Sequence, residues 1–268
     1  MKTLLTAILF CVAVSANGYV QLVHKEMSYR AFDRAIATGR MHLGVSRVQR
    51  ATLREVTATG AVDEDNGSRS VTHFFDPAHV APLEVPFPLG CARIFATAQE
   101  WALLPKEVTL NSYSLPDAKK RYASALTGSN PGTRDEDIRN LFLDLGHAIH
   151  LVQDMAQPEH TRNDQHLPNF YHTYGVDTEA SIWETWGAEN LIVDDASFKP
   201  VVPYDGYPNV RLRDYADYFT TADGKGMADF SNRSFVTQDT NYQDETVAGK
   251  CSITRSHAST TPRKGLSW

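Results

Sequence analysis

The stretch that decides the fold is residues 133–158, TRDEDIRNLFLDLGHAIHLVQDMAQP. Apolar side chains recur in it at the spacing of one helix face: Ile138, Leu141, Phe142, Leu145, Ile149 and Val152. This periodicity predicts a helix over residues 135–156. Because Leu143 and Leu151 lie on another side of the same helix, we expect it to be apolar nearly all round and therefore buried.

The two ends of this predicted helix carry their own signals. Thr133, followed three residues later by Glu136, matches a capping box, in which each side chain bonds a backbone N–H of the first turn. Pro158 lacks a backbone N–H and is expected to end the helix. Further helices are expected over 20–38 and 91–104 and from Pro116 onward, with some helical character over 210–235.

No stretch keeps the alternation of a strand for long, and prolines make residues 82–88 irregular. Residues 57–70 form a polar stretch that contains glycine. The sequence thus predicts an all-α fold, a single multi-helix bundle over residues 19–236. Residues 237–268 are polar and lack periodicity, so we expect a flexible C-terminal tail there.

The first residues resemble an export signal. Lys2 provides a positive charge, Leu4 to Val14 form a short apolar run, and Ser15-Ala16 offer small residues for cleavage. We therefore expect residues 1–18 to be a signal peptide and the mature protein to be secreted or periplasmic. No later stretch is apolar and long enough to cross a bilayer, so no stable membrane insertion is expected.

The overall charge narrows the class of substrate only a little. A formal net charge of -6 provides no basic stripe of the kind that holds nucleic acid through its phosphates. Bound metal ions can supply the missing positive charge at a phosphate site. The composition therefore weakly favours substrates other than long polyanions.

The predicted helix also carries metal-ligand chemistry. His150 and Asp154 are four residues apart and project from one face, and His160 follows just beyond Pro158. Imidazole nitrogens and carboxylate oxygens are the ligands that zinc accepts where thiolates are absent. His147 lies on the same side of the helix, and spacing alone leaves it open as a further ligand.

Residues 145–160, LGHAIHLVQDMAQPEH, resemble the central motif of the zinc-dependent phospholipase C and P1 nuclease superfamily. That motif is His, three residues, Asp, five residues with Pro as the fourth, and His. It assigns the ligand role to His150 rather than His147. Three upstream pieces agree in order: His24 before Arg30-Ala31, GAVDED at 60–65, and HFFDP at 73–77.

The resemblance implies a set of metal ligands. A first ion would be held by four side chains: Asp65, His73, His150 and Asp154. A second ion would take His160 with a downstream His and Glu, and Asp154 would bridge the two ions. A third would use His24 with the mature N-terminus. Asp65 would also orient or deprotonate the attacking water.

The chain departs from the family pattern downstream. Glu184, within IWETW at 182–186, is the best match to the family's glutamate ligand, but Ala180 stands where the family has a histidine. His166 or His172 is a possible replacement ligand; otherwise Glu179 substitutes or the second site is incomplete. No Trp lies near the expected mature N-terminus, which leaves the third site open.

The resemblance implies an exported zinc-dependent phosphodiesterase of the phospholipase C type, with two or three ions. Manganese or another divalent ion is an alternative in a carboxylate-rich site. Two other functions remain open: a single-strand nuclease of the P1 type, and a non-catalytic exported binding protein with a degenerate site. The expected partner is a phospholipid or another phosphodiester, with single-stranded nucleic acid as the alternative.

Overall fold

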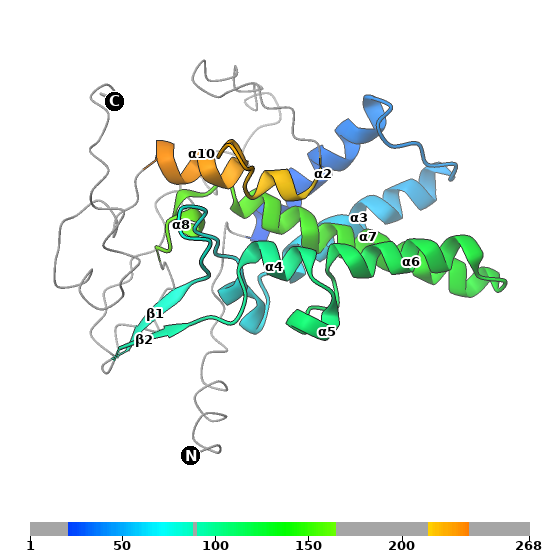
Figure 1. Cartoon of the computed structure of the whole chain (residues 1–268). Coiled ribbons are helices and arrows are strands. Elements are labelled where there is room, and N and C mark those ends of the chain that lie inside the picture. The colour runs from blue at the N-terminus through cyan, green and yellow to red at the C-terminus, as the bar shows by residue number, and fades with distance from the viewer. Residues whose placement is uncertain (1–20, 88–89, 165–213, 236–268) are drawn as a thin grey trace.

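The structure is a computed structural model that describes residues 21–87, 90–164 and 214–235 (Figure 1). Helices dominate this part of the chain, which confirms the mostly helical prediction. The long helices are α2 (Gln21–Ala37), α3 (Arg47–Asp63), α6 (Leu115–Thr127) and α7 (Pro131–Asp154). The shorter ones are η1 (Gly67–Thr72), α4 (Ala98–Leu103), α5 (Lys106–Thr109), α8 (Pro158–Thr161), η3 (Ala216–Tyr218) and α10 (Met227–Ser234). The expected signal peptide and C-terminal tail lie outside the described residues.

Helix α7 is the centre of the bundle. It packs along α3 and α6, and α2 packs on α3 and also contacts α7, so these four helices form one bundle (Figure 1). The buried side of α7 holds apolar and ionisable residues together: Phe142, Asp144, Gly146, His147, Ala148, His150, Leu151 and Asp154. The prediction that this helix is buried is therefore confirmed for its central and C-terminal turns.

Two glycines allow α3 and α7 to approach closely. A Cβ atom on Gly60 would lie 2.2 Å from the carbonyl oxygen of Leu143, and one on Gly146 would lie 2.1 Å from that of Thr57. No carbon fits at those distances, so only glycine permits this crossing. The close approach places the C-terminal end of α3 beside the ionisable face of α7.

Two apolar clusters hold the described helices together. One joins Phe75, Trp101, Leu151, Met155 and Phe219 with several alanines, and so ties α4 and α7 to the segment around η3 and α10. The other packs Phe32 of α2 and Leu53 and Val56 of α3 against Phe142 of α7.

The start of α7 differs from the prediction. The helix begins at Pro131, and the Asn130 side chain caps it by accepting hydrogen bonds from the N–H groups of Gly132 and Thr133. The Thr133/Glu136 capping box is therefore wrong, because Asn before Pro supplies a cap and a preset first turn four residues earlier. The helix ends at Asp154, and Pro158 begins the short helix α8 instead of ending α7.

Two other segments gain structure that the sequence pattern did not indicate. Residues 57–63, noted above only as part of a polar stretch, are the last turns of α3, although Thr and Gly are poor helix formers. Residues 82–88 were expected to be irregular and 91–104 helical, but β1 (Glu84–Phe87) and β2 (Gly90–Arg93) form an antiparallel hairpin in which Glu84 pairs with Arg93. Only Ala98–Leu103 of the second segment is helical, as α4.

Among the helices of the described ranges, none is both long enough and apolar enough to cross a membrane.

Candidate metal centre

Six predicted ligands from five parts of the chain meet at one end of the α3–α7 crossing. Asp65 comes from the turn after α3 and His73 directly follows η1. The others come from α2 (His24), α7 (His150 and Asp154) and α8 (His160). All six side chains are buried, with at most 2% of the surface exposed. Two carboxylates and four imidazoles are thus withdrawn from water together.

Local hydrogen bonds fix the orientation of two of the imidazole rings. His150 Nδ1 lies 2.6 Å from the backbone oxygen of Ala61, so Nε2 faces the centre. His24 Nδ1 lies 2.6 Å from Gln153 Oε1, which turns its Nε2 toward Asp154. A carbonyl or amide oxygen on the far nitrogen selects the tautomer that leaves the near nitrogen able to bind a cation.

A backbone contact joins the His73 segment to α8. The Phe75 N–H donates to the carbonyl oxygen of His160 at 2.9 Å, and His160 Nδ1 lies 3.3 Å from the His73 carbonyl oxygen. The ring of Phe74 stacks on the His160 ring with centroids 4.7 Å apart. The short aromatic run after His73 therefore anchors both histidines against the hydrophobic core.

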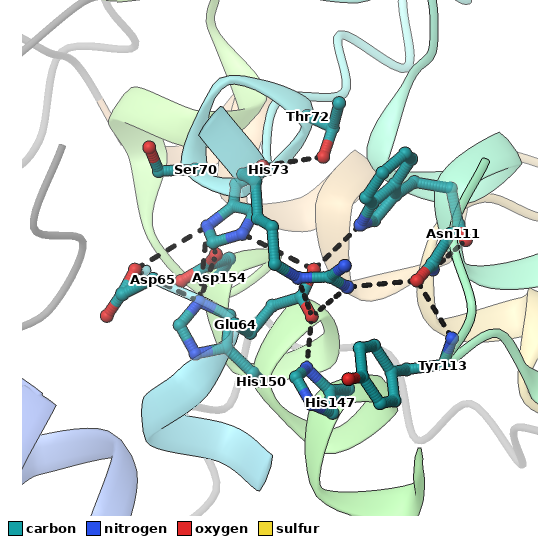
Figure 2. Close-up of polar contacts among 12 residues, drawn as sticks. Glu64, Asp65, Ser70, Thr72, His73, Asn111, Tyr113, His147, His150 and Asp154 are labelled. Atoms are coloured by element: carbon teal, nitrogen blue, oxygen red, sulfur yellow. Dashed lines mark hydrogen bonds and ion pairs between the residues drawn. The ribbon is translucent and has the colours of Figure 1, made fainter. Parts of the chain in front are cut away.

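Four atoms approach one another around a common point (Figure 2). Asp154 Oδ2 lies 3.1 Å from both His73 Nδ1 and His150 Nε2, and these nitrogens are 3.2 Å apart. Asp65 Oδ1 lies 3.4 Å from His150 Nε2 and 3.7 Å from His73 Nδ1. The four atoms are those that the resemblance assigns to the first ion.

These separations fit a divalent ion. Tetrahedral bonds of about 2.0–2.1 Å place neighbouring ligand atoms about 3.3 Å apart, and the observed range is 3.1–3.7 Å. Within the described part of the chain, the Asp154 oxygens lie off the N–H directions of these rings and accept no directional hydrogen bond. Ligand atoms that converge on an ion rather than on each other have this arrangement.

The remaining two histidines flank the four-atom cluster. His160 Nδ1 lies 3.4 Å from Asp154 Oδ2, and His24 Nε2 lies 3.5 Å from Asp154 Oδ1. Two triads of possible ligand atoms result, one of His24, Asp65 and His150 and one of His73, Asp154 and His160. Asp154 touches histidines on both sides, so it occupies a bridging position.

The electrostatics of the centre show the cost of burying these charges. Burial alone would raise the pKa of Asp154, but the charges of His150 and His160 hold it well below its usual range. Burial would lower the pKa of His73, yet Asp154 and Glu64 raise it to about 10. In the metal-free protein, His73 therefore keeps a proton that a metal ion must displace.

The other predicted ligands, Glu184, His166 and His172, lie outside the described residues and stay predictions. His147, which spacing left open, points away from the centre: its Nδ1 lies 2.5 Å from Glu64 Oε2. Glu64 was not singled out from the sequence. Its neighbour Asp65 drew attention through the resemblance, whereas nothing in the local spacing indicates that Glu64 meets a histidine 83 residues away.

Comparison of the chain with protein-family models, with curated proteins and with solved structures finds no match.

Proposed function

We propose that this chain is an exported, metal-dependent phosphoric ester hydrolase that resembles phospholipase C. The observation that carries the proposal is the buried cluster of His73 Nδ1, His150 Nε2, Asp154 Oδ2 and Asp65 Oδ1. The two nitrogens lie 3.1–3.7 Å from each other and from both carboxylate oxygens. The resemblance of residues 145–160 to the central motif of the phospholipase C and P1 nuclease superfamily supports the same reading.

The residues divide the binding task among them. The four clustered side chains would hold one ion, Asp154 and His160 would contribute to a second, and His24 would contribute to a third. Zinc is the first choice for imidazole and carboxylate ligands, with another divalent ion as the alternative. When bound, the ions would lower the pKa of water and offset the negative charge of the phosphate oxygens.

Asp65 is the proposed catalytic residue. Its carboxylate would orient the attacking water or accept its proton, as a general base must lie within hydrogen-bond reach of the water. The water oxygen would bond to phosphorus and the bond from phosphorus to the alcohol oxygen would break, so the alcohol and a phosphate monoester leave. For a phospholipid, the products are diacylglycerol and the phosphorylated headgroup.

We favour a phospholipid over a nucleic acid as the substrate. The net charge of -6 offers little long-range attraction for a polyanionic strand. The single-strand nuclease and the non-catalytic metal-binding protein are alternative outcomes of the test below.

The test compares Asp154→Asn with Asp144→Asn in the purified chain. Both residues are fully buried aspartates of α7, but Asp144 bonds Arg121 on α6 and lies outside the centre. Elemental analysis gives the metal content, and phosphatidylcholine vesicles and single-stranded DNA serve as substrates. We expect wild type and Asp144→Asn to hold two or three ions and to hydrolyse the lipid, and Asp154→Asn to lose both properties.

Each other outcome changes the conclusion. Cleavage of DNA but not lipid would replace the phospholipase with the nuclease. Bound metal without hydrolysis of either substrate would favour the binding protein. A wild-type chain that holds no metal would overturn the proposal.

A further inference from the structure

A second buried cluster adjoins the metal centre and surrounds Glu64, the residue before Asp65. The Glu64 carboxylate is fully buried and accepts three sets of hydrogen bonds. Trp101 Nε1 donates to Oε1 at 2.7 Å, and Arg69 donates to Oε2 from Nε at 3.0 Å and from Nη2 at 2.5 Å. His147 Nδ1 lies 2.5 Å from the same Oε2. We call these four residues the Glu64 cluster.

The surrounding residues hold the cluster rigid. Arg69 Nη2 also donates to Asn111 Oδ1 at 2.9 Å, and the guanidinium lies over the rings of Trp101 and Tyr113, 5.0 Å from each centroid. Tyr113 stacks on His147 with ring centroids 4.1 Å apart. The carboxylate is therefore fixed by groups from four separate elements or loops.

Glu64 is ionised in this setting. Burial would raise its pKa, but the Arg69 charge, the hydrogen bond from His147 and the nearby His73 imidazole hold it well below its usual range. The cluster thus keeps a negative charge at a defined position next to the metal centre.

His73 lies between the Glu64 cluster and the metal centre (Figure 2). Its Nδ1 is one of the four converging atoms, and its Nε2, on the opposite side of the ring, lies 3.6 Å from Glu64 Oε1. Nε2 makes no directional hydrogen bond within the described residues. An imidazole that binds metal through one nitrogen requires an acceptor at the other, and a carboxylate is among the common ones.

We propose that Glu64 is the positioning residue of His73: its carboxylate faces Nε2–H, fixes the ring orientation and strengthens Nδ1 as a metal ligand. Glu64 does not contact the ion or the substrate in this arrangement. It acts through His73, and Arg69, Trp101 and His147 hold it in place. The inference rests on the proposed function, because it requires that His73 bind a metal.

A purely structural role for Glu64 makes a different prediction. A residue that only ties η1 to α4 and α7 would change stability when replaced and would leave the metal affinity of the folded protein alone. A positioning residue changes the affinity and the geometry of the bound metal. Typical losses on removal of such a partner are about 10- to 100-fold in metal affinity.

The experiment uses the full chain and makes two measurements. Competition with a chelator gives the Zn2+ affinity, and the visible absorption of the Co2+-loaded protein reports the geometry of the bound metal. The variants are Glu64→Gln, which keeps the shape and removes the charge, and Asp144→Asn, which makes the same change at a buried carboxylate that bonds Arg121 outside both the Glu64 cluster and the metal centre. Circular dichroism reports folding. We expect Glu64→Gln to bind Zn2+ 10- to 100-fold more weakly with a shifted Co2+ spectrum, and Asp144→Asn to stay within about threefold of wild type.

Folded Glu64→Gln with wild-type affinity and an unchanged Co2+ spectrum would overturn the inference. If Glu64→Gln fails to fold, Glu64→Asp serves instead, because it keeps the charge but moves it one methylene away from His73. A wild-type Zn2+ affinity of Glu64→Asp would also overturn the inference. Failure of the proposed function is distinct: the wild-type chain itself would then bind no Zn2+. A wild type that binds Zn2+ and hydrolyses lipid, with unaffected Glu64 variants, would leave the function standing and remove only this inference.

Discussion

Glu64 and Asp154 are two fully buried carboxylates that face the same imidazole, His73, from opposite sides. Glu64 accepts directional hydrogen bonds from Trp101 and Arg69. Asp154 instead lies 3.1–3.5 Å from imidazole nitrogens, none of which aims a hydrogen bond at it. Buried polar groups nearly always have a bonding partner. Protein donors provide it for Glu64, and we expect a cation to provide it for Asp154.

The difference separates two sources of stability. The Glu64 cluster is complete within the protein and is expected to hold with or without metal. The centre around Asp154 gathers charge that the described residues compensate only in part, because His73 must remain protonated to balance the carboxylates. Metal binding and folding should therefore be coupled directly in the second region, and in the first only through the contact of Glu64 with His73.

The largest expected effect is on metal affinity as pH changes. The raised pKa of His73, about 10, means that the metal-free form gains stability from its proton below pH 6.5 and loses that gain as pH rises toward 10. Metal binding displaces this proton, so the affinity for Zn2+ should rise by up to about tenfold per pH unit from about pH 6 to pH 9. Chelator competition at constant ionic strength measures it. An affinity that is flat over this range would mean that His73 is neutral or is not a ligand.

A smaller effect, on stability, is expected when the α3–α7 crossing, which supports both the Glu64 cluster and the metal centre, is disturbed. Gly146→Ala would place a Cβ 2.1 Å from the Thr57 carbonyl oxygen and force α3 away from α7. We expect a loss of about 3 kcal/mol in the free energy of unfolding, reduced by the better helix propensity of Ala. Denaturant unfolding of the metal-free chain measures it. Gly44→Ala, where no atom lies within 4 Å of the new Cβ, is the matched control, and equal stability of the two variants would contradict the close-packing argument.

The crossing of α3 and α7 also explains which parts of the site could be predicted from the sequence. The spacing of His150 and Asp154 and the proline before His160 are local features, so the helix-borne part of the site was predictable from one segment. The contact of Glu64 with His147 depends on how α3 and α7 cross, and the glycines that permit it, Gly60 and Gly146, resemble helix breakers in a linear pattern. Because Gly60 resembles a helix breaker, the sequence pattern also did not indicate the last turns of α3.

The mispredicted start of α7 has a related cause. Two capping signals lie within seven residues, Asn130-Pro131 and Thr133 with Glu136, and each is sufficient alone. The earlier one prevails in the structure, because the Asn130 side chain reaches two N–H groups of the first turn. For residues 82–93, prolines suggested irregular structure, whereas a short two-stranded hairpin tolerates them at an edge.

A third prediction concerns the stability of the Glu64 cluster in the metal-free protein. Trp101→Phe removes the indole N–H that donates to Glu64 at 2.7 Å and keeps most of the buried ring. We expect a loss of about 1–2 kcal/mol in stability, the cost of leaving a buried acceptor with one bond fewer. Thermal unfolding should show this loss in the metal-free protein, and at least as large a loss with Zn2+, because Glu64 supports His73. A loss that appeared only in the metal-loaded protein would show that the bond from Trp101 does not stabilise the metal-free cluster.

The smallest expected effect concerns Asp144, a third buried carboxylate of α7, which has a single charged partner. Burial raises its pKa to about 6 against the opposing charge of Arg121, whose Nε donates to it at 2.7 Å. The folded state therefore favours the protonated acid, and that contribution is lost as pH rises from about 4 through 6. Asp144→Asn avoids the cost of ionisation, and Arg121, which is partly exposed, can be solvated instead.

We expect Asp144→Asn to gain up to about 1 kcal/mol relative to wild type between pH 5 and pH 8, since a buried ion pair is often no better than a neutral replacement. Urea unfolding of the metal-free proteins at both pH values measures the difference. If the variant instead lost stability as pH rose, the ion pair with Arg121 would outweigh burial. Asp144 would then resemble Glu64, because protein groups would stabilise its charge. Asp154 would be the buried aspartate of α7 whose charge requires a bound cation.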